Sequence, residues 1–130
     1  MSALVLAALR SRLSAVAGLL VVFGTPLTAA GIAARIPALT VIGPILLAAG
    51  LLTNAGLTAV RIAPRKAGVA RWLLMVSSLT VVVPMLLGVD YAIARVLPVP
   101  SLDLRTMALV HGDLNAIAYA LAGLAGWKLG

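Results

Sequence analysis

The side chains best suited to chemistry lie in one short segment, residues 111–115, which contains His111, Asp113 and Asn115. The chain has one histidine and three acidic residues, yet the histidine and one acid stand two positions apart within an apolar stretch. Histidine changes its charge near physiological pH, and a carboxylate in an apolar site can act as a general acid or base. A charged side chain inside a bilayer is unfavourable by roughly 2.5–3.5 kcal/mol on insertion scales, so it usually faces other helices or water. We therefore place the candidate functional site in this segment, which does not identify a substrate.

Helical spacing divides this segment into two faces. His111, Asn115 and Tyr119 are four residues apart, so on an α-helix they form one stripe, and we predict that they bind a ligand. The alternative for this stripe is a buried hydrogen-bond network that fixes helix packing. Asp113 lies about 200° around the helix from His111 and therefore points away from the stripe.

The carboxylates complete the set of catalytic candidates, which are His111, Asp113 and Asp90. Asp90 lies near the end of the preceding apolar run, which makes it the better carboxylate partner for His111. The alternative for Asp90 is an ion pair with Arg95 at the helix end. The partner of Asp113 is left open between another helix, a partner chain, an arginine and water.

The composition describes an α-helical integral membrane protein. Hydrophobic residues make up 63% of the chain and charged residues 10%, which is too little polar surface for a soluble domain of 130 residues. A transmembrane β-barrel would alternate apolar and polar residues, whereas this chain has long continuous apolar runs. We predict a single polytopic domain over residues 1–130.

The net charge of +7 does not indicate a nucleic-acid-binding protein. The ten lysines and arginines stand at the ends of apolar runs, where they anchor helices, and no basic face carries interleaved aromatic residues. The absence of cysteine excludes disulfides and thiolate metal sites. One histidine with one or two aspartates is too small a ligand set for a metal site, and no cofactor-binding motif is present. We expect no metal, no cofactor and no nucleic-acid partner.

Basic residues divide the chain into four apolar runs, each near the roughly 20 residues that cross a bilayer. The predicted fold is an all-α bundle of four transmembrane helices, at about residues 13–34, 36–60, 72–94 and 106–127. Pro26, Pro44 and Pro84 fall inside the first three and predict kinks. Asn54, Ser77, Ser78 and Thr80 form a second polar layer, expected to hydrogen-bond between the second and third helices. Gly123 and Gly126 are expected to be packing positions, and Trp72 and Trp127 interfacial anchors.

The distribution of basic residues predicts the orientation. An even number of spans places both termini and the loop 61–71 on one side of the membrane. That side carries seven of the ten basic residues: Arg10, Arg12, Arg61, Arg65, Lys66, Arg71 and Lys128. The positive-inside rule therefore predicts cytoplasmic termini and a multi-pass protein of a bacterial inner (plasma) membrane. In the alternative, residues 1–30 form a cleaved signal peptide and three spans remain.

The last third of the chain resembles a known family motif. Its positions are Met107, His111-Gly112, Asn115-Ala116, Tyr119, Gly123 and Gly126-Trp127, preceded by Tyr91 and Leu102-Asp103. This pattern, Met-x3-His-Gly-x2-Asn-Ala-x-Gly-Phe-x3-Gly-x2-Gly-Trp, is similar to that of the YndJ-like bacterial membrane proteins. It is specific over 91–127 and only compositional over 1–90.

The resemblance implies a polytopic membrane fold and directs attention to His111 and Asn115. Members of the family are mostly larger multi-span proteins without an established activity, sometimes described as transporters. The present chain departs from the motif at Ala118-Tyr119, which replaces Gly-Phe, and at Asp113, where an uncharged residue is expected. Its short length raises the alternative of a minimal or divided member that needs a partner.

These observations support three functional hypotheses. The first is a small transporter-like protein or transporter subunit with a polar site in the outer half of the bilayer. The second is a non-catalytic assembly protein that binds a homo-oligomeric copy or a membrane partner subunit. The third is a membrane-embedded enzyme that acts on a lipid-soluble substrate such as an isoprenoid by acid–base chemistry.

Overall fold

Every regular element that the structure describes is helical. The computed structural model describes the backbone of residues 3–130 and the side chains from Arg10 onward. The elements are α1 (Ala3–Ala34), α2 (Pro37–Leu57), the π-helical segment η1 (Thr58–Ile62), the 3-10 turn η2 (Ala63–Arg65), α3 (Gly68–Thr80), α4 (Val82–Ala94), α5 (Leu104–Asp113), the π-helical segment η3 (Leu114–Leu121) and α6 (Ala122–Leu129). Within the described residues they join into four stretches that are long and apolar enough to cross a membrane: Arg10–Ala34, Pro37–Arg65, Gly68–Ala94 and Leu104–Leu129. The predicted class, an all-α fold with four transmembrane helices, is confirmed.

The connection between the second and third spans is shorter than predicted. We expected a loop over residues 61–71, but the helix continues to Arg65 and α3 begins at Gly68. Arginine and lysine are good helix formers, so the basic residues that end the apolar run extend the helix instead of breaking it. The boundary of the apolar run is thus not the boundary of the helix.

The prolines act differently in the three spans that contain them. Pro26 and Pro44 lie inside α1 and α2, which continue through them. The third span, in contrast, divides at Val81 into α3 and α4, and Pro84 is in the first turn of α4. Proline is tolerated there because the first turn of a helix has no partner for the missing N–H.

The first two spans form a tight hairpin. Arg35 has a left-handed backbone with φ of 55°, and the N–H of Ile36 donates to the carbonyl of Gly31 at 3.0 Å, which closes α1 with a Schellman-type turn. A Cβ added to Gly31 would lie 2.6 Å from the nitrogen of Thr40, and one added to Gly43 would lie 2.5 Å from the nitrogen of Thr28. The two backbones are therefore in direct contact, as small residues allow in membrane helices.

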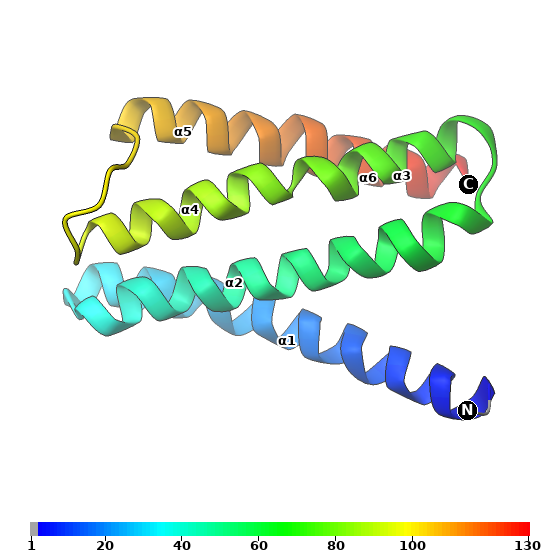
Figure 1. Ribbon diagram of the computed structural model, residues 1–130, viewed down its shortest axis with the longest axis horizontal. Helices are drawn as coiled ribbons and strands as arrows, with labels where there is room; N and C mark the ends of the chain where they lie inside the picture. Colours follow the sequence, from blue (N-terminus) through cyan, green and yellow to red (C-terminus); the bar gives the residue numbers. More distant parts are fainter. Residues whose placement is uncertain (1–2) are drawn as a thin grey trace.

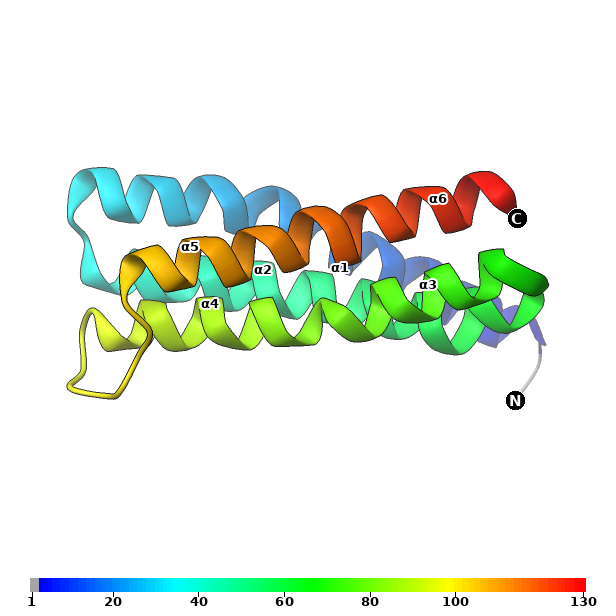
Figure 2. The same ribbon diagram turned by 90° about the horizontal axis from the view of Figure 1, so that it is seen from above.

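The four spans form an open bundle. Among the described residues, α1 contacts only α2, whereas α2 contacts α3 and α4, and these two contact α5, η3 and α6. Both chain termini lie at one end of the molecule, and α1 diverges from α2 toward that end (Figure 1). Seen from above, the second half of α1 and the α6 end of the last helix lie on the same side of the layer made by α2, α3 and α4, whereas the first half of α1 descends to the level of that layer (Figure 2). We call the end with the termini the proximal end and the opposite end the distal end.

Two contacts fix the ends of the last span. At its start, the carboxylate of Asp103 accepts a hydrogen bond from the N–H of Thr106 at 3.0 Å and caps α5. Hydrogen bonds from the side chain and backbone of Thr106 hold the pKa of Asp103 below its usual value, so the cap is charged at neutral pH. At its finish, the ammonium of Lys66 lies 5.7 Å from the ring centre of Trp127. Trp72 and Trp127 are both exposed at this proximal end, as expected of interfacial anchors.

Candidate functional site

His111 is held by two hydrogen bonds from different elements. Its Nδ1 lies 2.8 Å from the carbonyl oxygen of Pro84, and its Nε2 lies 3.0 Å from the amide nitrogen of Asn115. A carbonyl oxygen only accepts, so Nδ1 carries the hydrogen, and in the neutral ring Nε2 accepts from the Asn115 amide. The other end of that amide, Oδ1, is buried without a partner. The geometry therefore defines one neutral tautomer and leaves one acceptor atom unused beside it.

The expectation that Asp90 pairs with His111 is wrong. Both ring nitrogens are occupied by Pro84 and Asn115. Asp90 is two residues after Gly88, and a Cβ at Gly88 would lie 3.2 Å from the imidazole. Two residues turn a helical side chain by about 200°, so Asp90 lies on the face of α4 away from His111. Helix rise predicts the shared depth of the two residues but not the face of α4 on which Asp90 lies.

Gly88 makes room for the imidazole. A Cβ at this position would lie 3.2 Å from Cε1 of His111, which is tighter than ordinary van der Waals contact. Gly88 is four residues after Pro84, so the glycine and the accepting carbonyl share one face of α4. Sequence reasoning missed both residues, because neither a backbone carbonyl nor a glycine has a side chain that indicates the contact.

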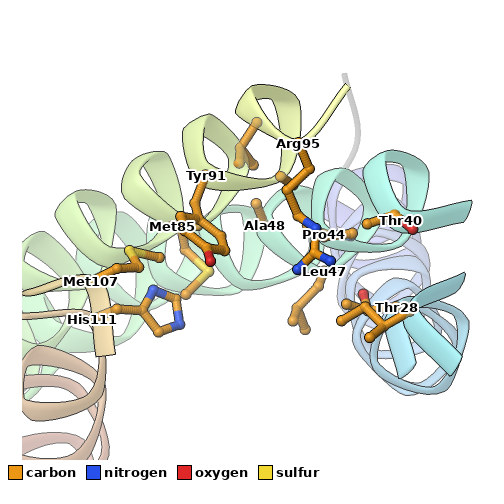
Figure 3. A pocket seen from close by; sticks show the side chains of 14 residues that line it. Thr28, Thr40, Pro44, Leu47, Ala48, Met85, Tyr91, Arg95, Met107 and His111 are labelled. Atoms are coloured by element: carbon orange, nitrogen blue, oxygen red, sulfur yellow. The ribbon is translucent and has the colours of Figure 1, made fainter. Parts of the chain in front are cut away.

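His111 lines a cavity at the distal end of the open bundle. The cavity has a volume of about 200 Å³ and lies between α1 and α2 on one side and α4 and α5 on the other. Tyr91 of α4 and Arg95, which directly follows α4, also line the cavity. Thr28 and Thr40 line its opposite wall. Figure 3 shows Arg95 extending toward α2, while His111 and Met107 lie at the other end of the cavity. The remaining lining is apolar: Ile32, Pro44, Leu47, Ala48, Met85, Gly88, Val89, Ala92 and Met107.

Tyr119 belongs to a second cavity. This proximal cavity has a volume of about 320 Å³, and Asn54, Ser77 and Trp127 are among the other residues that line it. Tyr119 is eight residues, or about 12 Å, along the helix from His111, and the helix between them is π-helical over Leu114–Leu121. Of the three residues of the predicted stripe, only His111 and Asn115 are in contact with each other.

The second polar layer makes a different contact from the one predicted. The hydroxyl of Ser77 donates to the carbonyl of Tyr119 at 2.8 Å, which joins α3 to η3, not to the second span. Thr80 bonds within its own helix, to the carbonyl of Val76. A Cβ at Gly123 would lie 2.8 Å from the Ser77 hydroxyl, and one at Gly126 would lie 2.8 Å from the side chain of Leu74. Both glycines are therefore packing positions, as predicted.

The aspartates do not line either cavity. Asp113 is exposed on the face of α5 that points away from His111, and Asp90 is partly buried. In the described part of the chain, no three histidine, cysteine, aspartate or glutamate side chains come close enough to hold a metal ion. The polar groups that the distal cavity offers a ligand are thus hydroxyls, a guanidinium and the edge of the imidazole.

Comparison with known proteins gives a family. No curated protein and no solved structure matches the chain. The model of the family described as YndJ-like protein matches residues 1–119. The match therefore includes the first ninety residues, where the sequence resemblance was only compositional, and it contains His111, Asn115 and the elements that hold them. The chain belongs to the YndJ-like protein family.

Proposed function

We propose that the chain is a small transporter-like membrane protein, or a subunit of a transporter, whose solute enters the distal cavity. The observation that carries this proposal is the pair of cavities on the open side of the bundle, one near each end. They share no lining residue. The buried cluster of Ala48, Ala55, Val81 and Met85 packs between α2 and α4, with Tyr119 against it. A solute that passed along this side would meet a site in each half of the membrane and a closed layer between them.

In this proposal the distal end faces outward across a bacterial inner membrane. The support is the charge distribution, since only Arg35, Arg95 and Arg105 of the ten basic residues lie at the distal end. The open side of the bundle needs a second wall, which lipid, a second copy or a partner subunit supplies.

His111 is the proton acceptor of the proposed mechanism. Its Nδ1–H stays bonded to Pro84, so the incoming proton binds Nε2. Rotation of the Asn115 amide then replaces its N–H₂ group by Oδ1, the buried acceptor that has no partner in the neutral state. The same two residues thus satisfy the ring before and after protonation. Tyr91 and Arg95 are the other titratable groups that line this cavity.

Transport is tested by replacing His111 with glutamine, which keeps a donor for Pro84 but cannot take up a proton. In proteoliposomes with a trapped pH dye, we expect solute-driven proton flux for a panel of anionic, cationic and neutral solutes to fall at least about tenfold, because glutamine does not accept the proton that His111 carries in this mechanism. Gly112→Ala is the matched control, since a Cβ at Gly112 has no atom within 4 Å. Equal fluxes for wild type and His111→Gln, with both proteins inserted, would rule out the proposal.

A second candidate function, assembly with a membrane partner, is favoured by Asp113. This exposed carboxylate lies nine residues, or about 13 Å, along the helix from Leu104, and among the described residues it forms no ion pair. A charge that faces lipid at this depth is unfavourable, whereas a donor from another chain would satisfy it.

Assembly is tested by native mass spectrometry of the solubilised protein. We expect wild type to carry a stoichiometric second chain, either another copy or a partner subunit, and Asp113→Leu to lose it. Asp103→Asn is the control because Asp103 caps α5 outside the span. A monomeric wild-type protein, or an Asp113→Leu protein that keeps the second chain, contradicts this candidate function.

A further inference from the structure

Two arginines from different parts of the chain converge at the distal mouth of the open bundle. Arg95 follows α4 and lines the distal cavity, into which its side chain extends (Figure 3). Arg35 lies in the turn between α1 and α2 and lines a smaller cavity of about 170 Å³. The two cavities are neighbours, because Ile32, Thr40 and Arg95 line both.

No carboxylate balances these two charges. Neither cavity is lined by aspartate or glutamate, and in residues 10–130 neither arginine forms an ion pair with an acidic side chain. Arg35 and Arg95 are both exposed, and the side chain of Arg95 extends across the mouth of the cavity toward α2 (Figure 3). A guanidinium in such a place is stabilised by an anion, for which its planar donors are well suited.

The backbone at Arg35 supports a role for its side chain. Arg35 occupies the left-handed position that ends a Schellman-type turn, where glycine is favoured because other residues are strained. Glycine would relieve that strain but would remove the guanidinium from the cavity.

Apart from Thr28, Thr40 and Tyr91, the lining of the distal cavity between the arginines and His111 is apolar. Ile32, Leu47 and Met85 are among the side chains that line it between the two ends. An inorganic anion would leave this surface uncovered, whereas an amphiphile would cover it and bring its charge to the mouth.

We propose that the distal cavity binds an amphipathic anion, with a phosphate or carboxylate head between Arg35 and Arg95 and an apolar chain directed toward His111. This inference rests on the proposed function, because it names the class of solute that the transporter-like site takes. In this proposal Arg35 and Arg95 bind the anionic head, and the apolar lining binds the hydrocarbon chain.

The test uses decyl phosphate as the probe and native mass spectrometry of the full chain released from maltoside micelles. We expect wild type to retain one decyl phosphate in preference to decylphosphocholine and to inorganic phosphate. Arg95→Gln and Arg35→Gln should each lower the apparent affinity about 10- to 100-fold, as expected when a charged hydrogen-bonding group is lost. Arg105→Gln is the matched control, since all three distal arginines are exposed but Arg105 lines neither cavity. Arg35→Gly should lose the same affinity while its thermal unfolding temperature rises.

Three outcomes overturn the inference: equal retention of decylphosphocholine, equal retention of inorganic phosphate, or an Arg105→Gln protein as impaired as Arg95→Gln. The second would show that the apolar lining does not contribute to binding. The third would show that binding depends only on the total positive charge of the distal end. Failure of the proposed function is distinguishable, because selective binding without any flux in proteoliposomes would remove transport and leave the anion site. Flux of other solutes without binding of decyl phosphate would remove the anion site and leave transport.

Discussion

Replacing Gly43 with alanine is expected to separate the first two spans and to destabilise the protein by about 1–3 kcal/mol. The added Cβ would lie 2.5 Å from both the backbone nitrogen and the hydroxyl of Thr28, and 2.7 Å from its Cα. The Thr28 hydroxyl donates to the carbonyl of Gly24 at 2.7 Å, so a rotation of the side chain away from the new Cβ would break this hydrogen bond. The contact is with backbone, and it is relieved only if the helices move apart.

The effect is measured as the free energy of unfolding in mixed micelles, with Gly56→Ala as the control on the same helix. A Cβ at Gly56 has no atom within 4 Å, and alanine stabilises a helix relative to glycine by roughly 0.5–1 kcal/mol. The two variants therefore change stability in opposite directions although their chemistry is identical. If both behaved alike, the contact between α1 and α2 would not be the one described.

The transmembrane class was predictable because it depends on the length and polarity of runs, not on their contacts. Four apolar runs between basic residues were enough to predict four helices and termini at one end. The open arrangement was not predictable, because in lipid no hydrophobic force decides which helices meet. Which helices pack together depends on local contacts such as that of Gly31 with Thr40. The lengths and positions of the apolar runs do not indicate these contacts.

The candidate site was predictable only where it depends on helical spacing. His111 and Asn115 are one turn apart, and the structure brings their side chains within 3.0 Å. The second partner of His111 is a backbone carbonyl, which every residue has, so no side-chain pattern identified Pro84. Tyr119 lies two turns further along the helix and lines the proximal cavity, and its spacing from His111 did not indicate that the two residues line different cavities. Arg95 was interpreted as a possible pair for Asp90, because spacing does not tell which way a flexible side chain at a helix end turns.

Replacing Gly88 with valine is expected to displace His111 and to abolish the defined tautomer of its ring. A Cβ alone would lie 3.2 Å from Cε1 and 3.5 Å from Nδ1, and valine adds two further methyl groups on that Cβ. The ring is bonded to Pro84 on one side and Asn115 on the other, so moving it lengthens at least one of these bonds. We expect a loss of about 1–3 kcal/mol in stability from overpacking, together with the same loss of flux as His111→Gln.

The measurement is nitrogen NMR of histidine-labelled protein, which gives one pair of ring signals because the chain has a single histidine. Wild type should show a protonated Nδ1 and an unprotonated Nε2, since the Pro84 carbonyl can only accept a hydrogen bond. Gly88→Val should show a mixture of tautomers, whereas Gly112→Val, next to His111 in the sequence but in open space, should keep the wild-type signals. Stability alone cannot separate a displaced imidazole from general strain, but the tautomer can. A Gly88→Val protein that kept the wild-type tautomer would show that the Pro84 and Asn115 bonds do not depend on the space at Gly88, and the link between this glycine and the candidate site would then be lost.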